Sequence, residues 1–305
     1  GGIKGFTVIG GKNPEATDVV IEESESVDVE AEPMVEIADE YLEKIIDVCR
    51  QNDIKLIFVN IPYGESAGRY RSTSDYSKEH NIPYYDFNEK KLYNSINYSV
   101  SENLYGHPNY LGAEKISDCI GAILKNEYGV SERIDNSYEI CNELYEHKVE
   151  NIKLKDITDI YEYLETVNKN RYDIFVMGTT DIGKLADERL VDELHALGFN
   201  SDLRGVSENT HYCAVKSTDG IIEKLTSENI NFYGSIRQGL TNYSYKVDTS
   251  AMIPRGHVYS LNIAGVESGN SASGINIVVY DEEEKMIIDK VNFYTSDEGV
   301  KASRY

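Results

Sequence analysis

In the first half of the chain, the apolar positions alternate between a helical spacing and short continuous runs. Between residues 34 and 49 they recur every three or four positions, which predicts an amphipathic helix. Continuous apolar runs over residues 55–61 and 82–87 are typical of buried parallel strands. The spacing also predicts helices near residues 71–80 and over 112–124. Helices that alternate with strands predict an α/β domain.

The second half begins with the same alternation and then turns to strands. A helix is predicted over residues 157–167, a strand over 172–177 and a helix over 181–197. The last two extended segments predict a hairpin across the acidic turn at 281–285. The further predicted strands cover residues 212–216, 244–247, 257–263, 275–280 and 286–293. This half is therefore predicted to be an α+β domain rich in strands.

A polar segment separates the two halves. Residues 128–150 are weakly periodic and rich in Asn and Glu, as is typical of a linker or docking segment. A chain of 305 residues is also long enough for two domains. We predict a first domain over residues 1–130, a linker or docking segment over 131–155 and a second domain over 156–305.

Charge and composition narrow the range of partners. The chain has 53 acidic and 30 basic residues, a net charge of −23, and its basic residues are scattered. This distribution argues against a nucleic-acid partner and against attraction to an anionic membrane. No apolar run approaches the roughly 20 residues that span a bilayer, so we expect no membrane contact by this chain itself. The four cysteines form no Cys-x-x-Cys pair and the histidines no metal motif, so we predict no metal and no other cofactor.

A histidine on a loop before a helix is the first candidate for catalysis. Residues 106–117 read Gly-His-Pro-Asn-Tyr-Leu-Gly-Ala-Glu-Lys-Ile-Ser, which puts His107 where a general base could face the carboxyl edge of a sheet. Together with the preceding strand and helix, this segment resembles the last block of the SGNH (GDSL-type) hydrolases, in particular their DltD-type cell-envelope branch. The matching residues are His107, Asn109, Gly112, Ala113 and Lys115.

The resemblance covers roughly residues 4–128 and implies part of a flavodoxin-like parallel sheet, with His107 and Asn109 as catalytic residues. The acid that this family places three residues before the histidine is Leu104 here, and the Gly-Asp-Ser block that supplies its nucleophile is absent from the chain. Asp86 and Glu102 are the carboxylates that remain to orient His107. Either the serine lies upstream of this sequence or the domain is inactive, and this chain alone is expected to be inactive.

Ser66 offers an alternative nucleophile. Residues 64–68 match Gly-x-Ser-x-Gly, and Ser66, Asp86 and His107 follow the chain order of α/β-hydrolase triads. That motif needs a strained turn directly between a strand and a helix, whereas the residues after Ser66 begin no clear helix by their pattern. We therefore rank Ser66 below an upstream serine.

The second half carries a resemblance of its own. Residues 274–281 (Gly-Ile-Asn-Ile-Val-Val-Tyr-Asp) and 288–295 (Ile-Asp-Lys-Val-Asn-Phe-Tyr-Thr) resemble the hairpin of the interleukin-like EMT inducer (ILEI) family. Asp181, residues 197–199 and Arg204 resemble its α/β portion, which here precedes the hairpin. The family includes a sugar-binding stem domain, so the resemblance implies carbohydrate binding. Asp181 and Arg204 offer an acceptor and a donor to sugar hydroxyls, and a plain helix N-cap and a surface charge remain open as readings.

These observations favour a bacterial, extracytoplasmic cell-envelope protein whose second domain binds a cell-surface glycan or polysaccharide. The chain opens Gly-Gly-Ile-Lys rather than with Met, so we expect its natural N-terminus and a membrane anchor to lie upstream. Two alternatives stay open. One is an acyltransferase or esterase of cell-surface polysaccharide or teichoic acid whose serine lies upstream, and the other is a protein-interaction module.

Overall fold

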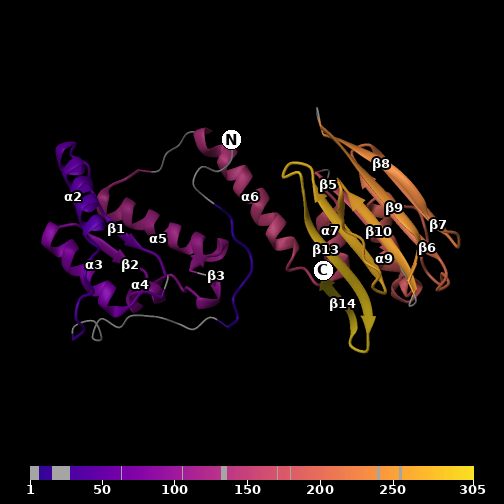
Figure 1. Cartoon of the computed structure of the whole chain (residues 1–305), viewed down its shortest axis with the longest axis horizontal. Helices are drawn as coiled ribbons and strands as arrows, with labels where there is room; N and C mark the ends of the chain where they lie inside the picture. The colour runs from indigo at the N-terminus through magenta and orange to yellow at the C-terminus, as the bar shows by residue number, and fades with distance from the viewer. Residues whose placement is uncertain are drawn as a thin grey trace. The chain divides into compact units, whose positions relative to one another are not determined.

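The computed structural model describes residues 7–15, 28–62, 64–104, 106–131, 136–169, 171–178, 180–238, 241–253 and 256–305. Across these residues the chain is a mixed α/β protein, with mostly antiparallel sheets and a small parallel pair. Contacts divide the chain into two compact units, Gly1–Val149 and Glu150–Tyr305 (Figure 1). The division falls inside the segment 131–155, most of which is the helix α6 (Glu139–Leu154).

Unit 1 is built around two short parallel strands. β1 (Phe58–Asn60) and β2 (Tyr84–Asp86) pair so that Asn60 lies opposite Asp86. The helix α3 (Ala67–His80) connects them, since parallel neighbours need a crossover. Figure 1 shows α2 (Glu36–Gln51), α3 and α5 (Tyr110–Tyr128) around this pair. The smaller elements are α4 (Lys90–Ser95), the 3-10 helices η1 (Val100–Glu102) and η2 (Asn136–Tyr138), and the antiparallel pair β3 (Asn103–Leu104) and β4 (His107–Pro108).

The sequence predicted α2, α3, α5, β1 and β2 but not all of their ends, and it did not predict the smaller elements. The helix expected near residues 71–80 begins at Ala67, because the Ser66 hydroxyl accepts a hydrogen bond from the Arg69 amide and caps the first turn. The two strands are shorter than the apolar runs that predicted them. In α2, only Ile46 is buried, and Ile37 and Tyr41 on the apolar stripe are 62% and 58% exposed.

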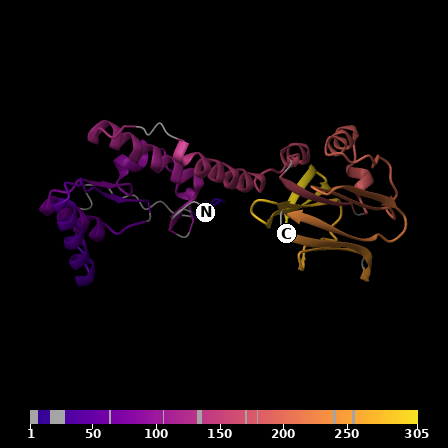
Figure 2. The ribbon, with the colours of Figure 1, turned by 90° about the horizontal axis from the view of Figure 1, so that it is seen from above.

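Unit 2 has three layers, which Figure 2 shows from another side. Its six-stranded antiparallel sheet has the order β14-β13-β12-β5-β6-β7. These strands are β5 (Tyr172–Gly178), β6 (His211–Ser217), β7 (Gly220–Thr226), β12 (Ile275–Asp281), β13 (Met286–Ser296) and β14 (Gly299–Arg304). One face packs against α7 (Ile160–Val167), α8 (Ile182–Leu185) and α9 (Glu188–Ala196), and the other against a second sheet. That second sheet has the order β11-β10-β9-β8, with β8 (Asn231–Gln238), β9 (Thr241–Ile253), β10 (Gly256–Ile263) and β11 (Val266–Glu267).

The position of β5 inside the six-stranded sheet explains why its sequence is continuously apolar. Ile174 and Val176 belong to the core under the helices, whereas Phe175 and Met177 belong to the core between the two sheets. Because both faces are covered, all seven residues of β5 are buried. The hairpin expected from residues 275–293 is confirmed as β12 and β13, which pair antiparallel. Two fully packed cores therefore hold the surface loops of unit 2 in place.

The helix expected over residues 181–197 is wrong in one respect, since it is two helices. α8 ends at Leu185, and α9 begins after Asp187, whose carboxylate accepts a hydrogen bond of 2.8 Å from the Leu190 amide. Asp187, which lies inside the range of the expected helix, thus caps the start of a second helix, α9. The short α8 and its preceding loop are therefore positioned separately from α9.

Candidate functional site

A polar cluster lies at the carboxyl ends of β1 and β2. Asn60 and Asp86 are the last residues of the two strands and lie opposite each other, so their side chains meet. The Asp86 carboxylate accepts hydrogen bonds from the Tyr84 hydroxyl, from Asn60 Nδ2 at 3.2 Å and from the Asn88 amide at 2.7 Å. Asp86 is 1% exposed, and these donors compensate for burying its charge. This is the sheet edge at which α/β proteins usually place their ligands.

Glu65 joins this cluster from the loop between β1 and α3. Its carboxylate accepts a hydrogen bond from Asn60 Nδ2. Burial raises the pKa of Glu65 to about 7, and the charge of Asp86 and a hydrogen bond to Asp86 act in the same direction, while Arg69 opposes them. Near neutral pH Glu65 can therefore both donate and accept a proton.

Sequence reasoning missed Glu65 and Asn60. A signal for Asn60 exists, because it is a polar residue at the end of an apolar strand, as Asp86 is. No local pattern marks Glu65, whose pKa depends on Asp86, 21 positions further along the chain.

Among the residues that the structure describes, Ser66 serves to cap a helix. Its hydroxyl caps α3 and donates a hydrogen bond to Glu32. The backbone at Ser66 is ordinary extended chain, with φ −72° and ψ 150°. A nucleophile elbow requires a strained turn that presents the serine above the sheet. The helix that begins directly after Ser66 fits that motif, although the sequence pattern did not predict it there. The unstrained backbone of Ser66 does not fit the motif.

The SGNH-like motif divides into residues with structural roles and one without. Asn109 is 1% exposed, caps α5 by accepting from the Gly112 amide at 3.0 Å, and donates to the Gly11 carbonyl at 2.7 Å. A Cβ at Gly112 would lie 2.7 Å from the Tyr98 ring, so only glycine fits there. Lys115 pairs with the buried Glu102 at 2.7 Å. These three matches of the motif are thus accounted for by folding.

His107 remains as the exposed member of that motif. It lies on β4 opposite Leu104. Within the residues that the structure describes, its ring has no hydrogen bond to Asp86 or Glu102, the two carboxylates considered for orienting it. Glu102 is occupied by Lys115 and by the Ser99 amide, and Asp86 by the donors at the strand ends. The structure therefore brings Asp86 together with Glu65 rather than with His107.

The candidate site of unit 2 lies around Asp181, at the start of α8. Asp181 occupies the N-cap position, but its side chain makes no cap hydrogen bond. Its carboxylate instead accepts from Lys184 Nζ at 2.7 Å and from the Ser273 hydroxyl, which belongs to the loop before β12. These hydrogen bonds from Lys184 and Ser273 lower the pKa of Asp181, so it is ionised throughout the neutral range. Asp181 therefore holds the N-cap position of α8, but its carboxylate binds Lys184 and Ser273 instead of the helix backbone.

The loop that carries Arg204 runs alongside α8. A Cβ at Gly183 would lie 2.5 Å from the Val206 backbone oxygen, and Lys184 forms an ion pair of 3.4 Å with Glu208. The Arg204 guanidinium donates to Asp202 through Nε at 2.9 Å and Nη2 at 2.6 Å, and these hydrogen bonds lower the pKa of Asp202 to about 2. The segments of Asp181 and Arg204 are thus neighbours, with the Arg204 side chain oriented by Asp202.

Metal binding and membrane insertion find no support in the described ranges. No three His, Cys, Asp or Glu side chains gather there in a way that could hold a metal ion. No helix in the same part of the chain is long and apolar enough to cross a membrane. Comparison of the chain with protein-family models, with curated proteins and with solved structures found no match.

Proposed function

We propose that the chain is a glycan-binding protein of the bacterial cell envelope, in which unit 2 is an ILEI-like module that carries the sugar site. The observation that supports this most directly is the surface cluster of Asp181, Ser273 and Lys184 beside the Arg204 loop. Charged groups that neighbours already hold in place form strong hydrogen bonds and lose little side-chain entropy on binding. A neutral or amino-sugar polymer is the proposed partner, because a net charge of −23 repels strongly anionic polymers.

Unit 1 is proposed to be part of an SGNH-like α/β domain that acts outside the cytoplasm and holds no nucleophile in this chain. Its parallel β1-α3-β2 unit and the loop before α5 that carries His107 support this proposal. Ile37 on α2 is 62% exposed and Val59 on β1 is 38% exposed. Parallel sheets are normally covered on both faces, so apolar exposure of this kind is expected where a sheet and its helices belong to a larger domain.

A glycan array followed by titration tests the sugar site. We expect weak binding of an N-acetylhexosamine-containing or other envelope glycan, with a dissociation constant of about 0.1–1 mM, because sugar hydroxyls exchange hydrogen bonds with water. Asp181→Ala and Arg204→Ala should each weaken binding at least about fivefold, the cost of one charged hydrogen bond. Asp297→Ala and Lys301→Ala are matched controls, since both residues lie on the exposed turn and edge of the β13–β14 hairpin.

Two results would contradict this proposal. The first is the absence of binding to any neutral or amino-sugar glycan at millimolar concentration. The second is binding that Asp181→Ala and Arg204→Ala leave unchanged while circular dichroism shows an intact fold. In that second case the resemblance would report architecture only.

A second candidate function is esterase or acyltransferase activity on a cell-surface polymer, with the nucleophile outside this chain. His107 favours it, because Asn109, Gly112 and Lys115 of the same motif have structural roles and His107 has none in the described residues. An exposed imidazole on a loop before a helix can act as a general base. The exposed apolar stripe of α2 is the observation that favours a protein-interaction module instead.

A further inference from the structure

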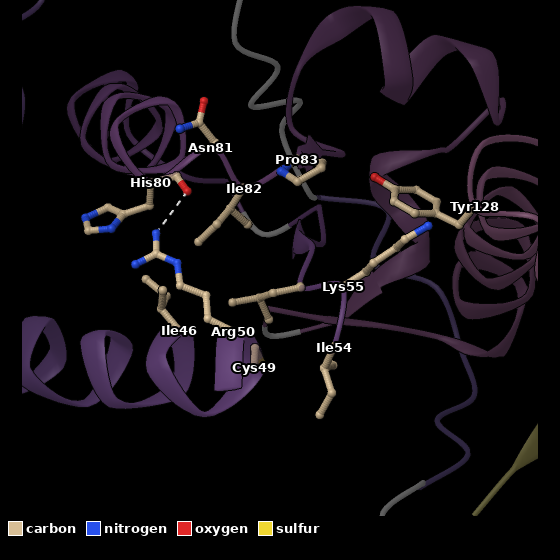
Figure 3. Close-up of a pocket in the computed structure, with 11 residues that line it drawn as sticks. Ile46, Cys49, Arg50, Ile54, Lys55, His80, Asn81, Ile82, Pro83 and Tyr128 are labelled. Carbon is tan, nitrogen blue, oxygen red and sulfur yellow. Dashed lines mark hydrogen bonds between the residues drawn. The ribbon is translucent and has the colours of Figure 1, made fainter. Parts of the chain in front are cut away.

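The cavity of unit 1 does not single out a ligand. It has a volume of about 330 Å³ and is lined by the ends of α2, α3 and α5 and by the segment that leads into β1 (Figure 3). In Figure 3, Arg50 extends toward His80. Lys55 extends toward Tyr128, so its charge does not meet that of Arg50 at one point. Unit 2 holds a more informative feature, which is a pair of buried polar side chains linked to Asp181 through one loop.

Asn276 on β12 and Asn292 on β13 lie opposite each other in the hairpin. Asn276 is 0% exposed and Asn292 is 3% exposed. Because side chains alternate along a strand, Asn276 shares its face with Val278, which belongs to the apolar core between the two sheets. A buried amide is tolerated in such a core only when its hydrogen bonds are made. The partners of these two side chains therefore indicate what they do.

Both amides bind the loop of residues 268–274, which leads into β12 and which we call the Ser273 loop. Asn292 Nδ2 donates to the Ser273 carbonyl at 3.0 Å and to Asn276 Oδ1 at 3.1 Å. Asn276 Nδ2 donates to the Ala272 carbonyl at 3.1 Å. These two consecutive carbonyls lie ahead of the first paired residue of β12. The asparagine side chains therefore hold a part of the chain that lies outside the backbone ladder of the sheet.

A turn at Gly274 also constrains the Ser273 loop. Its φ is +111°, in the region that favours glycine, and a Cβ there would lie 2.0 Å from the backbone oxygen of Phe293. Any other residue would push the loop away from β13. Ser273 is therefore fixed by the turn that follows it and by the hydrogen bond that its own carbonyl accepts from Asn292.

The Ser273 hydroxyl connects the loop to Asp181. It donates a hydrogen bond to one carboxylate oxygen, and Lys184 donates to the other. The segment of Asp181 follows β5, and the Ser273 loop precedes β12. The register pairs Gly178 with Ile275 at this edge of the sheet, so the two segments leave neighbouring strand ends. A hydroxyl on a fixed backbone has fewer directions open to it, so it holds the carboxylate in one orientation.

We propose that Asn276 and Asn292 are positioning residues of the sugar site in unit 2. They hold the Ser273 loop, and the Ser273 hydroxyl orients the Asp181 carboxylate for a sugar hydroxyl. The inference rests on the proposed function as far as the sugar is concerned, whereas the link from the asparagines to Asp181 can be measured without a ligand. A site whose groups are oriented before binding loses less entropy, which matters most where each contact gains little.

The pKa of Asp181 in the full chain measures this link, by carboxyl carbon-13 NMR of labelled aspartate with Asp181→Asn for the assignment. Hydrogen bonds from Lys184 and Ser273 lower this pKa in the wild type. Asn292→Leu has nearly the same shape and no donor, so it should release the Ser273 loop and raise the pKa. The rise should be at least about half of that in Ser273→Ala, which removes the hydroxyl itself.

Asn276→Leu is a second variant of the same kind. It releases the Ala272 carbonyl and removes the acceptor of Asn292, so it should also raise the pKa of Asp181. An unchanged pKa in Ser273→Ala, or in the asparagine variants that fold, overturns the proposal.

Asn151→Leu is the matched control. Asn151 is a buried asparagine of unit 2, 7% exposed, and it bonds Asp281 and Tyr172 rather than the Ser273 loop. Its replacement should leave the pKa of Asp181 unchanged. If Asn151→Leu raises that pKa as much as Asn292→Leu does, a general loosening of unit 2 explains the effect and the proposal fails.

Titration with triacetylchitotriose, a neutral N-acetylhexosamine oligosaccharide, tests the role of the asparagines in binding. Asn292→Leu should weaken binding at least about threefold, and Asn151→Leu should leave it unchanged. Equal binding by the wild type and by Asn292→Leu overturns the role in the sugar site. If the wild type binds no glycan at millimolar concentration, the proposed function of unit 2 fails, and the pKa of Asp181 alone decides whether the asparagines position that carboxylate.

Discussion

Replacing Glu65 by glutamine should stabilise unit 1 at high pH and have little effect at low pH. Glutamine resembles the protonated carboxyl group, since it can accept the hydrogen bond from Asn60 and donate one to Asp86. The pKa of Glu65 is raised from its ordinary value of 4.5 to about 7, first by burial and then by the charge of Asp86. The folded state therefore favours the neutral acid form of Glu65 over the carboxylate.

The sign and the size of the effect follow from the two pKa values. Below about pH 4.5 Glu65 is protonated in both the folded and the unfolded chain, so its ionisation costs nothing. Between pH 4.5 and 7 only the unfolded chain releases the proton, and the free energy of unfolding falls as the pH rises. Each pH unit corresponds to about 1.36 kcal/mol, and solvent screening of a half-buried group reduces the total to about 1–2 kcal/mol.

Urea unfolding read by hydrogen-exchange mass spectrometry measures this effect in unit 1, using peptides from α3 and β2. Glu65→Gln should equal the wild type near pH 4.5 and exceed it by about 1–2 kcal/mol at pH 8. Glu79→Gln is the control, because Glu79 is exposed near the end of α3, the helix that follows Glu65, and the change removes the same charge. A gain that does not grow with pH, or that Glu79→Gln reproduces, would refute the reasoning.

Two further outcomes follow from other contacts. Arg304→Met should lower the free energy of unfolding of unit 2 by about 2–4 kcal/mol in urea denaturation, because it leaves the buried Asp289 without its ion pair of 3.3 Å; a loss no greater than that of the exposed Lys301→Met would contradict this. In hydrolysis of 4-nitrophenyl acetate, the wild type should be no faster than His107→Ala, since no nucleophile is expected in this chain. A faster wild type, with the excess abolished by Ser66→Ala, would favour the Gly-x-Ser-x-Gly reading.

Periodicity predicted helices and strands well where apolar residues recur at a regular spacing or form an unbroken run. The helix over residues 34–49 and the hairpin over 275–293 follow directly from the spacing of apolar residues and are confirmed as α2 and as β12 with β13. The strands β7 and β14 were not predicted. β7 is mostly exposed, and β14 reads Gly-Val-Lys-Ala-Ser-Arg, so neither carries the apolar pattern of a strand. They form because β6 and β13 offer neighbouring backbone partners, which a local pattern does not record.

The polar sites were predictable only as residue types. Asp86 was recognised as an available carboxylate, but the group whose pKa it helps to raise is Glu65, which the loop before α3 brings to the same strand end. The motif around His107 drew attention to a helix start, and most of its residues turned out to hold that helix in place. Residues that recur together in a motif can therefore report the requirements of folding as well as those of catalysis.

Asp181 shows why the partner of a residue, rather than its position, decides what it can bind. An aspartate before a helix is usually its N-cap, yet Ser273, 92 positions away, and Lys184 hydrogen-bond its two oxygens. An ionised carboxylate has about four acceptor sites, and these two donors occupy two of them among the described residues. A sugar hydroxyl can thus add to Asp181 without displacing Lys184. Because the same hydrogen bonds lower its pKa, Asp181 offers those acceptors across the neutral pH range.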